Sequence, residues 1–239
     1  PWASAQQTAA GNEFDTLKQQ LIKDGFDPDK IEAILAKDTV SFTADSVSLF
    51  FVHSESSLNY DQFLSKDSIA NAFKYMAKHK ESLDRAQEMF GVDKTVITAI
   101  LLVETRLGTY LGNRIVINTL ATMASLADDT LRERIWNAIP DQKKPPRDAF
   151  LKKVDVRSKW GYEELKALIQ YADREGIDPE NIQGSYAGAM GISQFMPSNA
   201  LTLAKDGNND GRIDLFDHSD AIFSVANYLK LHGWKPGIS

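Results

Sequence analysis

Apolar residues recur every three to four positions along most of the chain, which is the spacing of one face of a helix. One such run extends from Phe14 to Leu21, and Gly25 ends it. Asp27 and Pro28 follow, and these residue types are typical of a helix N-cap and of the first helical position. Two successive N-terminal helices are therefore predicted.

The same spacing predicts a long helix from Asp67 to Gly91, with Ile69 and Phe73 facing inward, and another that Asp93 caps. The short apolar run 47–52 fits a strand or a buried helix, because periodicity cannot separate the two. Further helices are predicted at 118–136, at 160–176, shortly after Ser198 and around Ile222, with a polar break at 140–146. Strand signals are scarce, so the expected fold is mainly α.

Composition narrows the possible classes of protein. The 239 residues are 43% hydrophobic and 25% charged, which is ordinary for a globular protein. Lys and Arg total 27 against 33 Asp and Glu, giving a net charge of −6 that argues against nucleic acid or an anionic membrane as partner. No apolar run reaches the length of a membrane span. The absence of cysteine excludes disulfides, Cys-ligated zinc and a thiol nucleophile.

The first residues allow two interpretations. Ala3, Ser4 and Ala5 form a small-residue triplet of the kind that precedes signal-peptidase cleavage, so residues 1–12 can be the remnant of an export signal. A small, polar, disordered terminus explains them equally well.

Glu104 is the first candidate for chemistry. It lies in the apolar run V-I-T-A-I-L-L-V-E-T-R-L-G at 96–108, which predicts a buried helix. Burial favours the neutral, proton-donating form of a carboxyl group, which suits a general acid. The structural alternative is a buried ion pair, for example with Arg106.

A second candidate is the glycine- and alanine-rich segment 184–198, G-S-Y-A-G-A-M-G-I-S-Q-F-M-P-S. Its small residues permit close approach of a ligand, and Ser185 and Gln194 add hydrogen-bonding groups beside the apolar Phe195. That mixture suits a sugar. A tight packing loop is the alternative.

A third candidate is the loop 206–220, which matches the D-x-N-x-D-G pattern of an EF-hand. Oxygen ligands for calcium are predicted from Asp206, Asn208, Asp210 and the backbone carbonyl of Arg212. Asp217 stands where a longer Glu is usual, so the closing ligand is either Asp217 or Asp220. A single loop favours a structural clip over a calcium sensor; a turn that binds nothing is the alternative.

With these features in one order, the chain resembles the lytic transglycosylase B family, which cleaves the glycan strands of bacterial peptidoglycan. The resemblance rests on V-E-T-R-L-G at 103–108, on the segment 184–198 and on D-A-I-F-S-V-A-N-Y at 220–228. It covers roughly residues 60–235. It implies a lysozyme-like helical core at 59–239 with an insertion at about 127–160, preceded by an N-terminal helical region at 13–58.

By this resemblance, Glu104 is the single catalytic acid and base, and the product carries a 1,6-anhydro ring on N-acetylmuramic acid. Ser185 orients Glu104, while Gln194, Tyr228 and, on a weaker match, Tyr60 contact the glycan. Calcium is the expected metal, with no organic cofactor. The partner is peptidoglycan, and the location is the periplasm or cell envelope of a bacterium, after export.

Two other functions remain open at this stage. The family's best-known members continue past the H-G-W motif at 232–234 into a further segment with site residues. A binder of peptidoglycan that lacks this segment and does not cleave the glycan is therefore one alternative. A lysozyme-type hydrolase on the same fold, distinguished by its products, is the other. Endo or exo action, the preferred peptide stem, oligomeric state and protein partners have no signal in the sequence.

Overall fold

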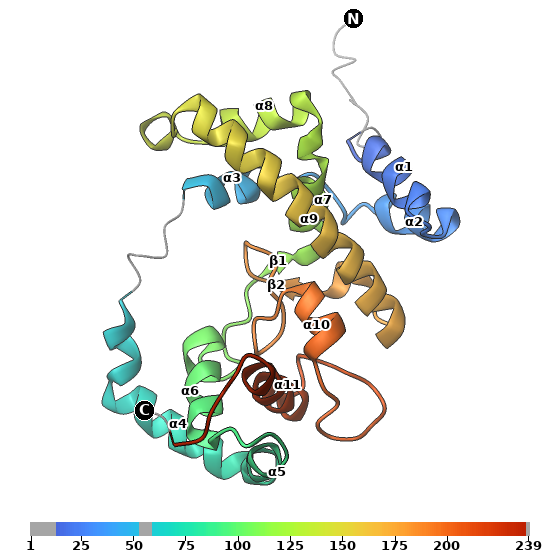
Figure 1. Ribbon diagram of the computed structural model, residues 1–239. Helices are drawn as coiled ribbons and strands as arrows, with labels where there is room; N and C mark the ends of the chain where they lie inside the picture. Colours follow the sequence, from blue (N-terminus) through green and yellow to red (C-terminus); the bar gives the residue numbers. More distant parts are fainter. Residues whose placement is uncertain (1–12, 53–58, 238–239) are drawn as a thin grey trace, which may run out of the picture. The chain divides into compact units, whose positions relative to one another are not determined.

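The computed structural model describes residues 13–52 and 59–237, and these residues are overwhelmingly helical (Figure 1). The prediction of a mainly α fold is therefore confirmed. The chain divides into two compact units, one of Pro1–Val52 with Ile117–Lys166 and one of His53–Val116 with Ala167–Ser239. Residues 117–166 thus group with the N-terminal helices, whereas the sequence interpretation assigned them to the core. That 127–160 is an insertion stays a prediction.

The first unit is built from packed helices. Its elements are α1 (Asp15–Lys23), α2 (Pro28–Leu35), α3 (Ala44–Val52), α7 (Val116–Ala124), the 3-10 helix η3 (Ser125–Ala127), α8 (Asp129–Ala138), η4 (Asp141–Lys143) and the first part of α9 (Arg147–Glu175). The ambiguous run 47–52 lies in helix α3. Val47 and Phe51 are buried four residues apart, and the Phe51 ring packs 5.1 Å from that of Phe150.

Polar contacts with α7 fix the segment between α2 and α3. The Thr43 N–H donates to Thr122 Oγ1 at 2.9 Å, and Asn118 Nδ2 donates to the Thr39 carbonyl at 2.8 Å. Near the C-terminal end of α7, Gly161 brings α9 so close that an added Cβ would lie 2.6 Å from the Cβ of Met123. This helix contact therefore requires glycine.

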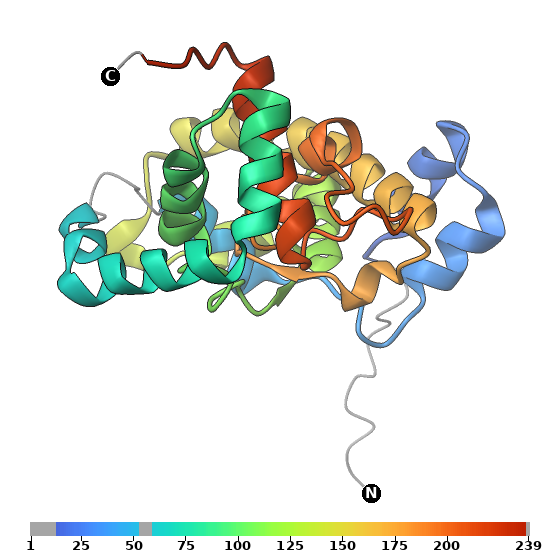
Figure 2. The same ribbon diagram turned by 90° about the horizontal axis from the view of Figure 1, so that it is seen from below.

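The second unit carries the three candidate motifs. Its elements are η2 (Tyr60–Leu64), α4 (Lys66–Lys78), α5 (Lys80–Phe90), α6 (Lys94–Thr105), β1 (Arg114–Ile115), the end of α9, η5 (Pro179–Asn181), β2 (Gln183–Gly184), α10 (Pro197–Leu203) and α11 (His218–Leu231). Strands β1 and β2 pair antiparallel, with Arg114 opposite Gly184. Figures 1 and 2 both show α11 packed beside α5 and α6.

The predicted single helix 67–91 is wrong, because it breaks at His79 into α4 and α5. The covered face of α4 runs through Ser68, Ala72 and Tyr75. Ile69 and Phe73, predicted to face inward, lie beside this face and are 45% and 68% exposed. The predicted helix 118–136 is also divided, since Asp128 caps a new helix, α8. The helix predicted from residue 160 begins earlier, at Arg147.

Local capping signals were predicted correctly. Asp27 accepts a hydrogen bond from the N–H of Lys30, with Pro28 as the first residue of α2. Asp93 accepts one from the N–H of Thr95 at 2.7 Å at the start of α6. Within the described residues, no helix has both the length and the apolar character needed to cross a membrane.

The cap of α6 gives a first prediction. The substitution Asp93→Ala removes an acceptor for an otherwise unpaired helix N–H, so the free energy of unfolding should fall by about 1 kcal/mol, measured by urea denaturation. Asp93→Asn should lose much less, and Glu88→Ala, at an exposed position of α5, serves as control.

The pH dependence has a definite sign. The hydrogen bond from the Thr95 N–H lowers the pKa of Asp93 below its ordinary value. The contribution of the cap is therefore present above the unfolded-state pKa and is lost as the pH falls through the lowered folded-state value. Equal stability of wild type and Asp93→Ala at neutral pH would contradict this account of the cap.

Candidate active site and calcium loop

Glu104 lies in the last turn of α6, and its side chain is exposed rather than buried. The expectation of a fully buried helix was wrong for a geometric reason. Ile97, Leu101 and Thr105 form the buried face at four-residue spacing, and Glu104 falls one position outside it. The carboxylate that the sequence singled out thus faces solvent at the end of a well-anchored helix.

The backbone after Glu104 adopts an uncommon conformation. Arg106 and Leu107 are consecutive non-glycine residues with φ of 50° and 62°, in the left-handed region that L-residues seldom occupy. The Leu107 N–H donates to the Leu101 carbonyl at 2.9 Å, and the Tyr110 N–H donates to the Thr105 carbonyl at 2.9 Å. These bonds end α6 sharply and fix the chain directly beyond the acid.

Thr105 joins this helix end to the glycine-rich segment. Its buried Oγ1 donates to the Ile192 carbonyl at 2.8 Å and accepts from the N–H of Gly108 at 3.0 Å. At Gly112 an added Cβ would lie 2.1 Å from the carbonyl oxygen of Gly184. Two of the three candidate motifs are therefore held together by direct contact.

Ser185 and Gln194 stabilise the glycine-rich segment itself. Ser185 Oγ accepts from the N–H groups of Ala187 at 3.2 Å and Ala189 at 3.1 Å. Gln194 has a φ of 49°, and its Nε2 donates to the carbonyls of Gly191 at 2.9 Å and Leu111 at 3.3 Å. Both side chains thus have structural contacts, and their functional roles stay predictions.

The two predicted tyrosines lie on different elements. Tyr228 is half-buried on α11, with its ring 5.6 Å from Phe195 and stacked on His232 at 4.0 Å. Tyr60 begins η2 and is 58% exposed, with its ring 6.4 Å from that of Phe63. Tyr228 therefore contacts the glycine-rich segment.

Sequence reasoning missed a cluster of rings beneath the end of α6. Tyr75 Oη lies 3.0 Å from His218 Nδ1, and the rings of His79 and His218 pack 4.4 Å apart. Burial lowers the pKa of His79 to about 4 and also lowers that of His218. An added Cβ at Gly108 would lie 3.0 Å from His218 Cε1. Tyr75 and His218 are 143 residues apart in sequence, so no local motif announces the cluster.

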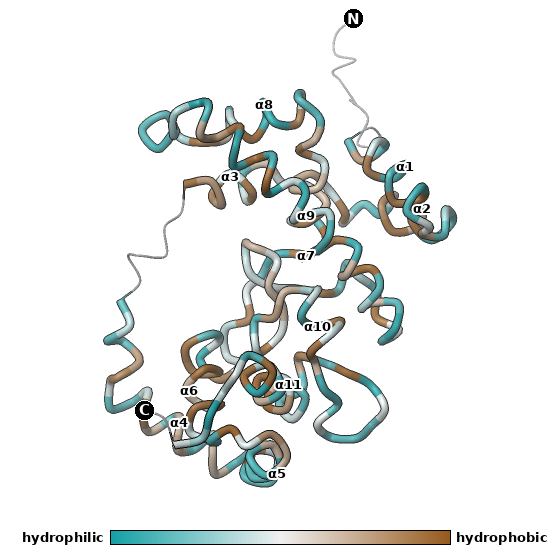
Figure 3. The backbone as a smooth tube through the Cα atoms, in the orientation of Figure 1, coloured by the Kyte–Doolittle hydropathy of each residue, from teal (hydrophilic) through white to brown (hydrophobic). Residues whose placement is uncertain are grey.

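The loop between α10 and α11 is held by its own side chains, and Figure 3 shows that it is largely hydrophilic. Asp206 accepts from the N–H groups of Asn209 at 2.6 Å and Gly211 at 2.9 Å. Asn208 and Asp210 accept from backbone N–H groups two residues further on, at Asp210 and Arg212. The oxygen-bearing side chains are thus folded onto the loop backbone.

Asp217 and Asp220 have different positions. Asp217 caps α11, accepting from the N–H of Ser219 at 2.7 Å. Asp220 is buried and accepts from the N–H groups of Gly207 at 2.8 Å and Asp214 at 2.7 Å, so it ties the two ends of the loop. Burial raises the pKa of Asp220 to about 6.

The donor set of this loop consists of carboxylate, amide and carbonyl oxygens, which is the chemistry that calcium prefers. Gly211, at the sixth loop position, has a φ of 88°, as the sharp turn of such a loop requires. In the described part of the chain, no three His, Cys, Asp or Glu residues are grouped as a metal site. The types of these residues therefore fit calcium. Their carboxylates, however, are not grouped closely enough to mark a metal site by position alone.

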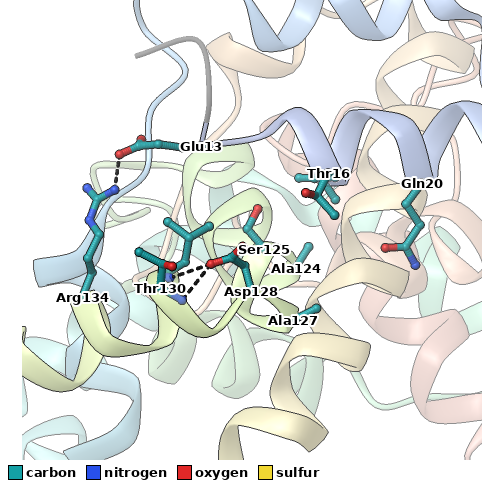
Figure 4. Close-up of a pocket in the computed structure, with 11 residues that line it drawn as sticks. Glu13, Thr16, Gln20, Ala124, Ser125, Ala127, Asp128, Thr130 and Arg134 are labelled. Atoms are coloured by element: carbon teal, nitrogen blue, oxygen red, sulfur yellow. Dashed lines mark hydrogen bonds and ion pairs between the residues drawn. The ribbon is translucent and has the colours of Figure 1, made fainter. Parts of the chain in front are cut away.

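A cavity of about 730 Å³ in the first unit lies apart from these motifs in sequence, between α1 and the segment from α7 to α8 (Figure 4). Its charged groups are engaged: Glu13 pairs with Arg134, and Asp128 caps α8 through the N–H groups of Thr130 and Leu131. These pairings leave little charge available to a ligand.

Comparison with known proteins places the fold. The family described as the transglycosylase SLT domain matches residues 9–239. The chain therefore belongs to the transglycosylase SLT domain family, and its helical architecture is the lysozyme-like fold of that family.

Individual relatives of the chain are also transglycosylases. The membrane-bound lytic murein transglycosylase B of Escherichia coli strain K12 is 35% identical over 176 residues, which is 74% of this chain and 41% of the relative. The structure of E. coli lytic transglycosylase Slt35 in complex with calcium matches with a TM-score of 0.75 at 30% identity, over 95% of this chain and 65% of that one. Soluble lytic transglycosylase SltB1 of Pseudomonas aeruginosa matches with a TM-score of 0.74 at 28% identity, over 94% and 68%. The chain thus spans less than half of the curated relative.

The hydroxyl of Thr105 gives a second prediction. Thr105→Val keeps the shape but leaves the Ile192 carbonyl and the Gly108 N–H unpaired in a buried place, which should lower the free energy of unfolding by about 1–3 kcal/mol. Thr105→Ser should retain most of the stability, as measured by thermal or urea unfolding.

Thr98→Val is the matched control, because Thr98 is buried on the same helix and its hydroxyl donates to the carbonyl of Lys94 within α6. A loss of stability as large for Thr98→Val as for Thr105→Val would show that the bond to Ile192 has no special importance.

Proposed function

We propose that this protein cleaves the glycan strands of peptidoglycan as a lytic transglycosylase. The observation that supports this function most directly is the location of Glu104. It stands exposed at the end of α6, and its neighbour Thr105 joins that helix end to the glycine-rich segment by a 2.8 Å hydrogen bond. Membership of the transglycosylase SLT domain family gives the class of reaction.

In the proposed reaction, the neutral Glu104 carboxyl donates its proton to the oxygen that bridges N-acetylmuramic acid and N-acetylglucosamine, and the bond from C1 to that oxygen breaks. The N-acetyl group of the muramic sugar stabilises the positive charge at C1. The Glu104 carboxylate then accepts the proton of the C6 hydroxyl as O6 bonds to C1, closing the 1,6-anhydro ring. One carboxyl group suffices because the substrate assists its own cleavage.

The exposure of Glu104 assigns a role to the substrate. A glycan lying over α6 would displace water from the carboxyl group, and desolvation favours its neutral, proton-donating form. The sequence analysis expected burial within the protein to desolvate the Glu104 carboxyl group. In this proposal the bound sugar does so instead.

Ser185 is proposed to orient Glu104. Its oxygen already accepts hydrogen bonds from two backbone N–H groups. The hydroxyl can therefore donate its own proton to a further acceptor such as a carboxylate. Gln194, Tyr228 and Tyr60 are proposed to contact the glycan, with Tyr228 and Gln194 joined through the glycine-rich segment.

The third prediction tests the reaction. Purified peptidoglycan treated with the protein should release fragments that end in the anhydro sugar, lighter by one water than hydrolysed fragments, as read by mass spectrometry. Glu104→Gln should lower product formation by at least 100-fold, because the general acid is lost. Glu88→Gln, at an exposed position of α5, is the matched control and should leave it unchanged.

Other product patterns would replace the proposal. Hydrated reducing ends that depend on Glu104 would identify a lysozyme-type hydrolase. Binding to peptidoglycan without new chain ends, unaffected by Glu104→Gln, would identify a non-catalytic binder.

We further propose that the loop 206–220 binds one structural calcium ion. The ion would be held by Asp206, Asn208, Asp210 and the backbone carbonyl of Arg212. The types of residue in the loop and the calcium complex of the relative Slt35 support this proposal. Asp220, buried between the two ends of the loop, is the better candidate to close the site, since Asp217 caps α11. The ion would neutralise these carboxylates and fix the entry to α11; no organic cofactor is proposed.

The fourth prediction concerns this ion. Calcium at about 100 times its dissociation constant should stabilise the fold by about 2.7 kcal/mol and raise the melting temperature relative to chelator. Asp210→Asn should reduce this shift strongly, whereas Asp148→Asn, at an exposed position of α9, should preserve it. Identical melting temperatures of the wild type in calcium and in chelator would speak against the site.

The proposed substrate lies outside the bacterial cytoplasm, so we propose that the protein acts in the periplasm or cell envelope after export. The membrane-bound E. coli relative supports the envelope. The triplet Ala3–Ala5 lies outside the described residues.

A further inference from the structure

Part of the glycine-rich segment forms a tight hairpin between residues 190 and 195. The N–H of Met190 donates to the Phe195 carbonyl at 2.9 Å, and the N–H of Phe195 donates back to the Met190 carbonyl at 3.1 Å. Ile192 lies within this hairpin and is buried. Its backbone N–H bonds to the loop 206–220, here called the calcium loop, and its backbone carbonyl bonds to the end of α6.

The N–H of Ile192 connects the hairpin to the calcium loop. It donates to the carbonyl of the fully buried Leu215 at 2.8 Å. An added Cβ at the neighbouring Gly191 would lie 2.5 Å from the Cβ of Leu215, so the two segments are in direct contact. Asp214, the residue before Leu215, donates its N–H to the buried carboxylate of Asp220 at 2.7 Å. The hairpin is therefore bonded to the part of the loop that Asp220 fixes.

The carbonyl of Ile192 connects the same hairpin to the end of α6. It accepts the hydroxyl of Thr105 at 2.8 Å, and the oxygen of that hydroxyl accepts the N–H of Gly108 at 3.0 Å. A single residue thus carries bonds both to the calcium loop and to the helix end that bears Glu104. The loop reaches Thr105 through two hydrogen bonds and the backbone of one residue.

A second contact joins the start of α11 to the same place. His218 follows Asp217, the cap of α11, and an added Cβ at Gly108 would lie 3.0 Å from Cε1 of its ring. The same added Cβ would lie 3.4 Å from two carbon atoms of the Ile192 side chain. The backbone shortly after Glu104 is therefore packed against both the end of the calcium loop and the hairpin.

The calcium loop and the end of α6 both need support from outside. The calcium loop carries five aspartates, which repel one another unless a cation neutralises them. The end of α6 is exposed at Glu104, and the left-handed residues Arg106 and Leu107 persist only because their surroundings hold them. Order lost in the loop should therefore loosen the support of Glu104.

We infer that Ile192, Leu215 and His218 are positioning residues that couple the calcium loop to the end of α6, so that calcium in the loop holds Glu104 in place. This inference rests on the proposed function, both for the ion and for the role of Glu104. It gives the ion an effect on the active site that is separate from its effect on overall stability.

Hydrogen exchange of the full chain, measured by mass spectrometry in calcium and in chelator, tests the coupling without any cleavage assay. Calcium should slow exchange roughly tenfold in the loop 206–220 and at least threefold in 104–112, where the Gly108 N–H is bonded to Thr105. The first half of α6, residues 94–101, precedes these bonds and reports any general gain of stability. The response of 104–112 should exceed that of 94–101.

Variants at both contacts identify the route. Thr105→Val should reduce the response of 104–112 at least twofold, and adding His218→Ala should abolish it, while the calcium loop still responds. Thr105→Ser keeps the hydroxyl and should restore the response. Thr98→Val removes a buried hydroxyl that bonds within α6 and should leave the response unchanged.

Two outcomes would overturn the inference. In the first, calcium protects the calcium loop but slows 104–112 no more than 94–101. In the second, Thr105→Val with His218→Ala keeps the full response of 104–112, which would show that the order of the helix end does not depend on these contacts.

Cleavage assays separate this inference from the proposed function. At a temperature where the chelated protein stays folded, removal of calcium should lower kcat at least fivefold with little change in KM, because Glu104 is displaced while the glycan contacts remain. Anhydro product formed at equal rates with and without calcium would refute the coupling alone. A calcium response of 104–112 in a protein that yields no anhydro product would refute the proposed reaction alone. No response in the calcium loop would refute the ion site, and the coupling with it.

Discussion

The hydrogen bond from Thr105 to the Ile192 carbonyl is the contact on which the candidate site depends. It joins the end of α6 to the glycine-rich segment through a buried hydroxyl, which also accepts the Gly108 N–H. The close approach of Gly112 to Gly184 reinforces the same junction. Catalytic geometry tolerates little displacement, so a short, buried, fully used polar contact is a suitable way to fix an exposed carboxylate.

The sequence predicted well what local chemistry decides. The caps at Asp27 and Asp93 depend only on neighbouring backbone groups, and both helices begin where those residues indicate. The break at His79 was not predictable in this way, since the apolar spacing continues through it. At this break the ring of His79 packs against that of His218, and the residues 67–91 alone give no sign of so distant a partner.

The prediction that Glu104 is buried was wrong for a related reason. An apolar run indicates that a helix packs somewhere, but which face is covered depends on elements distant in sequence. Here the glycine-rich segment covers Thr105 and leaves its neighbour open. The cavity between η2, α4 and the end of α6 was missed too, because Lys74, Lys78 and Arg106 form no motif in the sequence and line one cavity only in the folded structure.

The two left-handed residues that end α6, Arg106 and Leu107, limit how the protein can be altered. Each non-glycine residue in that conformation costs about 1–2 kcal/mol. Leu107 offsets this cost by burying its apolar side chain, so only at the exposed Arg106 would glycine or asparagine raise the stability. A stabilisation campaign guided by free energy alone would therefore choose Arg106 early. By relaxing the backbone it would also remove the guanidinium of Arg106, and with it the hydrogen bond that ties the end of α6 to Gln62.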